Sequence, residues 1–192
     1  MSAPLPQVYL IRHGETAWSL SGQHTGRTDI PLTPRGESDA RALAERLAGR
    51  TFAQVLTSPS LRARQTCELA GYITVAAATP DLYEWDYGQY EGRRTADILK
   101  ERPDWKPFEH GSPGGESLAA VATRAEQVIA RARSIPGDTL IFAHRDILRV
   151  VAALWARLPA IEARRLYMNP ASISVLGYDH GLDEPIIRAL NT

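Results

Sequence analysis

The residues best suited to chemistry are Arg12 and His13, which directly follow a short apolar run at residues 8–11. This run predicts a buried strand that presents an imidazole and a guanidinium at its carboxyl end. Open α/β sheets bind ligands at that edge. A planar guanidinium suits phosphate oxygens, and histidine can act as a neutral nucleophile at about neutral pH. The pattern therefore indicates phosphate chemistry through a histidine, and Gly14 would let the backbone approach closely.

Four further segments follow in order along the chain: Gly-Gln-His-Thr-Gly-Arg-Thr-Asp-Ile-Pro-Leu-Thr at 22–33, Ser-Pro-Ser-Leu-Arg-Ala-Arg-Gln-Thr at 58–66, Leu-Tyr-Glu-Trp-Asp-Tyr-Gly-Gln-Tyr-Glu-Gly at 82–92, and Phe-Ala-His at 142–144. With the Arg-His-Gly-Glu-Thr motif, they make the chain resemble the histidine phosphatase superfamily, also called phosphoglycerate-mutase-like. The resemblance covers nearly the whole chain, from residue 8 to about residue 176.

The resemblance implies a role for each of five residues. His13 is the nucleophile that takes the phosphoryl group, and Glu84, at the family's Leu-x-Glu position, is the general acid and base. Arg12, Arg62 and His144 form the phosphate cradle. Arginines in such a cradle hold phosphate oxygens in pairs and neutralise developing negative charge.

Neighbouring residues compete for two of these roles. Arg64 is close in sequence to Arg62, but the family's Arg-Ala-x-x-Thr pattern favours Arg62, and Arg64 is expected to be solvated or ion-paired. The Glu-Gly pair that contains Glu91 is more often structural in relatives. Glu116 looks like a helix-start residue, where its charge suits the helix dipole. The rivals of Glu84 are thus Asp86, Glu91 and Glu116.

Four more residues are expected to bind the substrate, namely Ser19, Thr25, Gly26 and Arg145. In similar proteins, Thr25 and the backbone amides around Gly26 close the other side of the pocket; a turn or helix cap is the alternative. Many relatives have Asn in place of Ser19, whose hydroxyl has a shorter reach. Relatives commonly have Gly after the second histidine, whereas Arg145 here either contacts phosphate or pairs with Asp146.

Short apolar runs alternate with amphipathic segments, which predicts an α/β layered fold. The resemblance implies three α/β/α layers around a mainly parallel central sheet. Strands are expected at residues 8–11, 55–57, 73–76, 140–143 and 172–178, with an edge strand at 186–190. Helices are expected from 33 or 34 to about 48, from 60 or 61 to 70, at 117–134 and at 146–158.

A chain of 192 residues can bury one core, so a single domain is expected over residues 1–192. Within it, residues 92–115 carry charged and aromatic side chains among prolines, which favours a lid or pocket wall over a core element. The alternative is a plain surface loop with one short helix around residues 95–100.

Composition restricts partners and location. Acidic and basic residues number 22 each, so no net field attracts nucleic acid or a membrane. A single cysteine, Cys67, fits a reducing compartment and is expected to be a buried, inert thiol. The short polar start and the lack of a long apolar stretch favour a cytoplasmic protein. No cluster has metal-ligand spacing, so the enzyme is expected to need no metal or cofactor. The oligomeric state stays open.

The expected partner is a small phosphorylated metabolite. Only 59 residues separate Glu84 from His144, which favours an open site, with water as acceptor, and hence a phosphatase over a mutase. The motifs most resemble sugar bisphosphatases of the sedoheptulose-1,7-bisphosphatase kind. A second substrate phosphate would need distal cations, and the candidates are Arg27, Arg93, Arg94 and Arg145. The alternative is that these arginines are only solvated surface charges.

Three alternatives to a sugar phosphatase are kept. Two have the same fold: a phosphoglycerate-mutase-type phosphotransferase and a phosphohistidine-protein phosphatase. The third is a catalytically silent module that binds phosphoproteins. Intact His13 and Glu84 argue against the silent module, because binding alone needs neither a nucleophile nor a proton donor.

Overall fold

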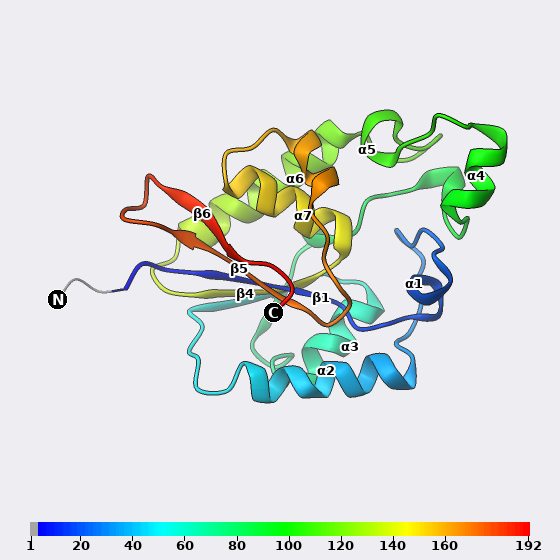
Figure 1. Ribbon diagram of the computed structural model, residues 1–192. Helices are drawn as coiled ribbons and strands as arrows, with labels where there is room; N and C mark the ends of the chain where they lie inside the picture. The colour runs from blue at the N-terminus through cyan, green and yellow to red at the C-terminus, as the bar shows by residue number, and fades with distance from the viewer. Residues whose placement is uncertain (1–3) are drawn as a thin grey trace.

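The computed structural model describes residues 4–192, and a six-stranded sheet divides them into layers (Figure 1). The strands are β1 (Val8–Arg12), β2 (Gln54–Thr57), β3 (Ala76–Ala78), β4 (Thr139–Ala143), β5 (Ile173–Tyr178) and β6 (Pro185–Ala189). Their order in the sheet is β3-β2-β4-β1-β5-β6. The first four strands in this order pair in parallel, and β5 and β6 pair antiparallel at one side.

Helices cover both faces of this sheet, which confirms the three-layer α/β prediction. α2 (Pro34–Arg46) and α3 (Leu61–Leu69) lie on one face, and α6 (Leu118–Arg133) and α7 (Arg145–Trp155) lie on the other (Figure 1). Side chains of β1 alternate between the layers: Leu10 packs in the core with α6 and α7, whereas Ile11 packs with α2 and α3. Among residues 4–192, every helix is too short or too polar to traverse a lipid bilayer.

The strand order brings three loops together at the carboxyl edge of the parallel strands. β4 lies between β1 and β2, so the residue that follows β4 is flanked by the residues that follow its neighbours. The His13 amide donates to the carbonyl of Ala143 at 2.9 Å, and the Ser58 amide donates to that of Phe142 at 2.9 Å. His144 therefore sits between His13 and Ser58 because of the sheet itself.

Two packing details hold the first motif in place. Thr33 caps α2, since its hydroxyl accepts the Gly36 amide at 3.0 Å, and Pro34 occupies the first helical position, as expected. A Cβ on Gly14 would lie 2.5 Å from the Gly36 carbonyl oxygen. Glycine at position 14 thus lets the loop after β1 touch the backbone of α2.

The sequence placed one strand wrongly. The apolar residues Tyr72 and Ile73 suggested a strand at 73–76, but the strand that pairs with β2 is β3, three residues further on. Tyr72 and Ile73 instead pack half-buried against the core of α2 and α3, in the turn after α3. Apolar side chains in a buried turn carry the same signal as a short strand, and pairing with β2 decides between them.

Short elements escaped the sequence analysis. α1 (Ala17–Ser21) has five residues and is held by a capping box between Thr16 and Ser19. α5 (Pro107–His110) has four residues and begins at a proline. Neither helix is long enough to show helical periodicity. Three 3₁₀ turns, at Pro80–Leu82, Gly88–Tyr90 and Ala160–Arg165, complete the chain.

Residues 92–115 differ from the expectation in one respect. They contain α4 (Thr95–Glu101) as well as α5, and their aromatic and aliphatic side chains are part of the main core. Ile98, Trp105 and Phe108 are all buried in the cluster formed with α6 and α7. The segment is therefore anchored by core residues rather than lying over the surface, although it also reaches the pocket described below.

Candidate active site

A pocket of about 100 Å³ opens at the carboxyl end of β1. Six of the nine residues predicted to form the site line it: Arg12, His13, Ser19, Thr25, Glu84 and Arg145. The other three, Arg62, His144 and Gly26, lie behind its wall and contact the lining residues or their neighbours. The remaining lining residues are Gly22, Gln23, His24, Tyr87 and Thr95.

His13 has the tautomer that a nucleophile requires. Its Nδ1 lies 2.7 Å from the carbonyl oxygen of Gly14, and a carbonyl only accepts, so Nδ1 carries the proton and Nε2 has the free electron pair. Burial, followed by the charges of Arg62 and Arg12, places the pKa of His13 well below its ordinary value. The imidazole is therefore neutral and available to attack phosphorus.

His144 lies next to His13 but deeper in the protein. The two ring centroids are 5.3 Å apart, and the His144 ring is fully buried. Its Nε2 lies 2.8 Å from the Ser58 hydroxyl, which fixes the ring. Burial, with the charge of Arg62 next in importance, lowers the pKa of His144, so this ring is also neutral in the free protein.

Arg12 and Arg62 approach His13 from two elements. Arg12, at the end of β1, donates from Nη1 to the Met168 carbonyl at 2.7 Å. Arg62, in the first turn of α3, is fully buried and donates from its two Nη atoms to the carbonyls of Thr28 at 3.0 Å, Gly26 at 3.0 Å and Thr25 at 3.2 Å. Arg62 thus ties the loop at 25–28 to the site.

Three buried polar atoms around His13 have no hydrogen-bond partner among residues 4–192: Nε of Arg12, Nε of Arg62 and Nδ1 of His144. Leaving such an atom without a partner lowers the free energy of unfolding by about 1–3 kcal/mol. All three come from residues predicted to hold phosphate. An anion with several acceptor oxygens is the kind of ligand that accepts from both guanidinium Nε atoms, and from Nδ1 of His144 once that nitrogen carries a proton.

The choice of Arg62 over its neighbour is supported by burial. Arg64 is exposed, on the outer side of α3, as expected of a solvated arginine. Cys67, on the same helix, is buried, and burial raises the pKa of its thiol to about 12. That thiol is inert at ordinary pH, as expected.

Glu84 lies on the pocket wall and binds the start of α7. Its carboxylate accepts the amides of Trp85, Asp146 and Ile147, each at 3.0 Å, and so takes the place of a helix-capping side chain. These amides lower the pKa of Glu84, but burial and the nearby charge of Asp146 outweigh them and raise it. A raised pKa suits a carboxyl group that must hold a proton before it donates it.

Of the two roles predicted for Arg145, the structure confirms the pairing with Asp146, and contact with phosphate stays a prediction. Arg145 lines the pocket, and it pairs with Asp146, through Nε at 2.9 Å and Nη2 at 3.4 Å. Asp146 is fully buried; it also accepts from Arg149 at 2.8 Å and from the Tyr87 hydroxyl at 2.5 Å. Burial would raise the pKa of Asp146, but the two arginines lower it, so the carboxylate stays charged and fixes Arg145.

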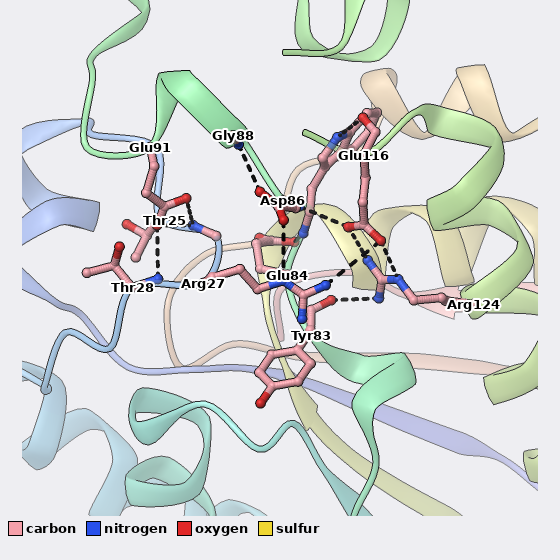
Figure 2. Close-up of polar contacts among 12 residues, drawn as sticks. Thr25, Arg27, Thr28, Tyr83, Glu84, Asp86, Gly88, Glu91, Glu116 and Arg124 are labelled. Carbon is pink, nitrogen blue, oxygen red and sulfur yellow. Dashed lines mark hydrogen bonds and ion pairs between the residues drawn. The ribbon is translucent and has the colours of Figure 1, made fainter. Parts of the chain in front are cut away.

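The three rival carboxylates are occupied elsewhere, as Figure 2 shows. Glu91 accepts the amides of Gly26, at 2.8 and 2.9 Å, and of Thr28, at 3.1 Å. Asp86 accepts the Gly88 amide at 2.8 Å. Glu116 is not a helix-capping residue: it binds Arg124 at 2.8 Å and 2.9 Å, and Ser117 caps α6. None of the three lines the pocket.

Three of the four candidate distal cations are ion-paired outside the pocket. Arg27 lies over the Tyr83 ring at 4.4 Å, between Asp86 at 3.8 Å and Glu116 at 4.0 Å (Figure 2). Arg93 and Arg94 pair with Glu101 and Asp97. Arg145 alone of the four lines the pocket.

The predicted binding roles of Ser19 and Gly26 differ from what the structure shows. The Ser19 hydroxyl donates to the Thr16 carbonyl at 3.0 Å, so its proton is used in the capping box of α1. The Gly26 amide is bound by Glu91, and the Gly26 carbonyl accepts from Arg62. Gly26 therefore positions Arg62 rather than facing the pocket. Thr25 does line the pocket, as expected.

Sequence reasoning missed four side chains of the pocket: Gln23, His24, Tyr87 and Thr95. His24 Nε2 lies 3.1 Å from the Thr95 hydroxyl, and burial lowers the pKa of His24 to about 4. Three of these residues, Gln23, His24 and Tyr87, lie inside motifs already noted, and only contact across the pocket distinguishes them. Thr95 belongs to the segment at 92–115, which therefore contributes to the pocket wall.

Within the described part of the chain, one group of side chains has metal-ligand geometry: Asp179, His180 and Glu184. All three are exposed in the turn between β5 and β6, at the opposite edge of the sheet from the pocket. They contribute nothing to the site around His13.

Comparison with known proteins gives a consistent result. The sequence model of the histidine phosphatase superfamily (branch 1) matches residues 8–191. An acid phosphatase of Mycobacterium tuberculosis is 41% identical, over 96% of this chain and 92% of its own. Sedoheptulose 1,7-bisphosphatase of Saccharomyces cerevisiae is 35% identical, over 81% of this chain and 69% of its own.

A solved structure of a Mycobacterium tuberculosis open reading frame superposes with a TM-score of 0.90, at 39% sequence identity and with 97% of both chains covered. The fold is thus shared across nearly the full length of the described chain.

Proposed function

The chain belongs to branch 1 of the histidine phosphatase superfamily and is a phosphoric monoester hydrolase; on that premise we propose that it hydrolyses small sugar phosphates through a phosphohistidine on His13. The observation that carries this proposal is the cluster around the His13 ring. Three buried polar atoms of Arg12, Arg62 and His144 without partners surround a neutral imidazole whose Nε2 is free.

In the first step, Nε2 of His13 attacks phosphorus and the bond from phosphorus to the ester oxygen breaks. Arg12 and Arg62 neutralise the charge on the equatorial oxygens, which is the largest contribution in sites of this type, and His144 contributes a hydrogen bond. Glu84, whose raised pKa favours the protonated form, gives its proton to the leaving alkoxide. The products are a free alcohol and a phosphohistidine.

In the second step, the Glu84 carboxylate takes a proton from water as the water oxygen attacks the phosphohistidine. The nitrogen–phosphorus bond breaks, inorganic phosphate leaves, and His13 and protonated Glu84 are restored. Covalent catalysis divides a very slow hydrolysis into two easier transfers.

The substrate class rests on two supports. The relatives include a protein named for a sugar bisphosphate, and the pocket is polar, with Arg145 at its edge beyond the catalytic residues. Residues 92–115 form part of the wall through Thr95, and we assign to them the role of pocket wall. A mutase-type phosphotransferase is the second candidate, because the same phosphohistidine could be passed to an alcohol.

The test of this proposal is a panel of phosphorylated metabolites, assayed with a chelator present. Inorganic phosphate and isomerised product are scored separately for each compound. We expect phosphate release from sugar phosphates without added metal. Isomerised product in excess of phosphate would identify the mutase, and release only from phosphohistidine peptides would identify the protein phosphatase.

The pH dependence of kcat/KM for an alkyl phosphate should follow the two shifted groups. Activity requires neutral His13, so it rises with pH through a pKa below the ordinary 6.5. It requires protonated Glu84, so it falls as the pH rises through a pKa above the ordinary 4.5. The substrate ester ionises in the same way whether the parent or Glu84→Gln is assayed. The difference between their two pH profiles therefore reports the ionisation of Glu84. A rising limb above pH 6.5 that is absent from the substrate's own titration contradicts this assignment.

Arg145→Gly should raise KM for sugar phosphates by about tenfold with a smaller change in kcat, because one charge-assisted hydrogen bond to substrate is lost. The measurement is steady-state kinetics across the same panel. Arg157→Gly is the control: Arg157 is exposed and has a φ of 59°, which glycine adopts readily. Unchanged constants for Arg145→Gly would assign this arginine to the surface.

A further inference from the structure

We propose that a second anion-binding subsite adjoins the catalytic pocket and takes the distal phosphate of a bisphosphorylated sugar, held by Lys106, Arg149 and Arg164 beside Arg145. This inference rests on the proposed function, since it places a second phosphate of the same substrate. It concerns residues that the catalytic cycle does not use.

The subsite is a separate pocket of about 180 Å³ that shares a wall with the catalytic one. Arg145 lines both pockets, and Asp146, which fixes Arg145, also faces the second one. Arg145 is therefore common to the walls of both cavities. A small substrate whose first phosphate lies at His13 would extend past Arg145 into this second pocket.

The charges of the second pocket favour an anion. Its four cations are Lys106, Arg145, Arg149 and Arg164, and its two carboxylates are Asp146 and Glu109. Asp146 is shared by Arg145 and Arg149, and Glu109 is shared by Lys106 and Arg164. Two positive charges are thus left uncompensated, and a phosphate monoester carries about that much negative charge at neutral pH.

The inner part of this pocket is rigid. Arg149 is 11% exposed, donates from Nε to the Ala163 carbonyl at 2.9 Å, and lies over the buried Phe108 ring at 4.8 Å. Its guanidinium is held by protein contacts on several sides, so little side-chain entropy is lost when a ligand binds.

The outer part can adapt to a ligand. Lys106 comes from the loop before α5 and Arg164 from the 3₁₀ turn after α7; their side chains are 66% and 37% exposed. Both bind Glu109, which is exposed, and a bound phosphate would displace this carboxylate from the same two cations. Segments distant in sequence thus converge on one cationic cavity next to the reaction centre.

The alternatives for a distal cation are weaker. Arg27, Arg93 and Arg94 line neither of these pockets. A second phosphate on the substrate therefore meets its nearest concentration of positive charge across Arg145.

Binding to the His13→Ala variant tests the subsite without turnover. Titration calorimetry compares fructose 1,6-bisphosphate with fructose 1-phosphate and fructose 6-phosphate, first in His13→Ala and then with Lys106→Ala and Arg164→Ala added. We expect the bisphosphate to bind at least about tenfold more tightly than either monophosphate in His13→Ala. The added substitutions should remove most of this preference.

Arg165→Ala in the same background is the matched control. Arg165 lies in the same 3₁₀ turn but pairs with Glu162 and does not line the pocket. It should keep the preference for the bisphosphate. The subsite is overturned if the bisphosphate has no advantage, or if the Lys106 and Arg164 substitutions weaken bisphosphate and monophosphates equally. If 3-phosphoglycerate binds more tightly than the bisphosphate, relative to the monophosphates, the pocket takes a carboxylate instead.

A result that contradicts the subsite can be distinguished from one that contradicts the proposed function. The wild-type protein is assayed in parallel with p-nitrophenyl phosphate, whose single phosphate needs only the catalytic pocket. Absence of phosphate release in that assay contradicts the proposed function. Normal release together with no preference for the bisphosphate contradicts the subsite alone.

Discussion

Alanine at position 13 is expected to reduce phosphate release from any monoester by at least about a thousandfold, because removal of a nucleophile leaves only binding and charge stabilisation. Binding of phosphate ligands should partly survive, since Arg12, Arg62 and His144 keep their positions in the protein. This division between lost turnover and retained binding separates an enzyme from a phosphoprotein-binding module.

The measurement combines phosphate release with calorimetry of inorganic phosphate. His180→Ala is the control, because His180 is exposed in the turn after β5 and lies outside the pocket. It should behave like the parent protein. Turnover by His13→Ala at the parental rate would show that the reaction does not pass through this imidazole.

Glutamine in place of Glu84 is expected to slow alkyl phosphates by about a hundredfold or more, the usual contribution of a general acid. Aryl phosphates should be slowed much less in the bond-breaking step, because a phenolate leaves with little protonation. Glutamine keeps the size of the side chain, and its single amide oxygen can still accept one of the two amides at the start of α7 that Glu84 binds. The circular dichroism spectrum and melting temperature of Glu84→Gln should match those of the parent, so that the effect reports the proton rather than a collapsed helix.

The measurement is single-turnover kinetics with a series of esters whose leaving groups differ in pKa. The dependence of log rate on leaving-group pKa should become steeper in Glu84→Gln. Glu126→Gln, at an exposed position of α6, is the matched control and should leave the slope unchanged. Equal slowing of alkyl and aryl esters in the first turnover would remove Glu84 from the acid role.

Much of the site could be predicted because its residues follow the carboxyl ends of strands. His13 and His144 each come directly after an apolar run, and parallel pairing of β1 with β4 then places them side by side. Arg62 could be chosen over Arg64 from the motif. The hydrogen-bond partners of two residues could not be predicted: the Ser19 hydroxyl donates to the Thr16 carbonyl, although Ser19 lines the pocket, and the Gly26 amide donates to Glu91.

The distal cations were the least predictable part. A lone arginine in the sequence does not reveal whether a carboxylate is near it in space, and Arg27 proved to lie between two of them. The cations next to the pocket, Lys106 and Arg164, are far apart in sequence and meet only because α5 packs beside the 3₁₀ turn at Ala160–Arg165. No spacing rule connects such residues.

The fold was predictable where periodicity was long and unreliable where elements were short. α6 and α7 were found within a few residues, whereas β3 was misplaced and α1 and α5 were missed. β3 consists of alanines, which have little preference for strands, and it exists because β2 offers an edge to pair with. Tertiary pairing of this kind has no local sequence signal.

The central claim is most directly tested by trapping the phosphoenzyme. Glu84→Gln is mixed with p-nitrophenyl phosphate, which does not need the acid but leaves a phosphohistidine that water attacks slowly without the base. After a rapid quench in alkali, where phosphohistidine is stable, the modified residue is located by mass spectrometry. We predict one phosphoryl group, on His13. A phosphoryl group on His144 or His24, or a burst of p-nitrophenol with no phosphorylated protein, would contradict the account.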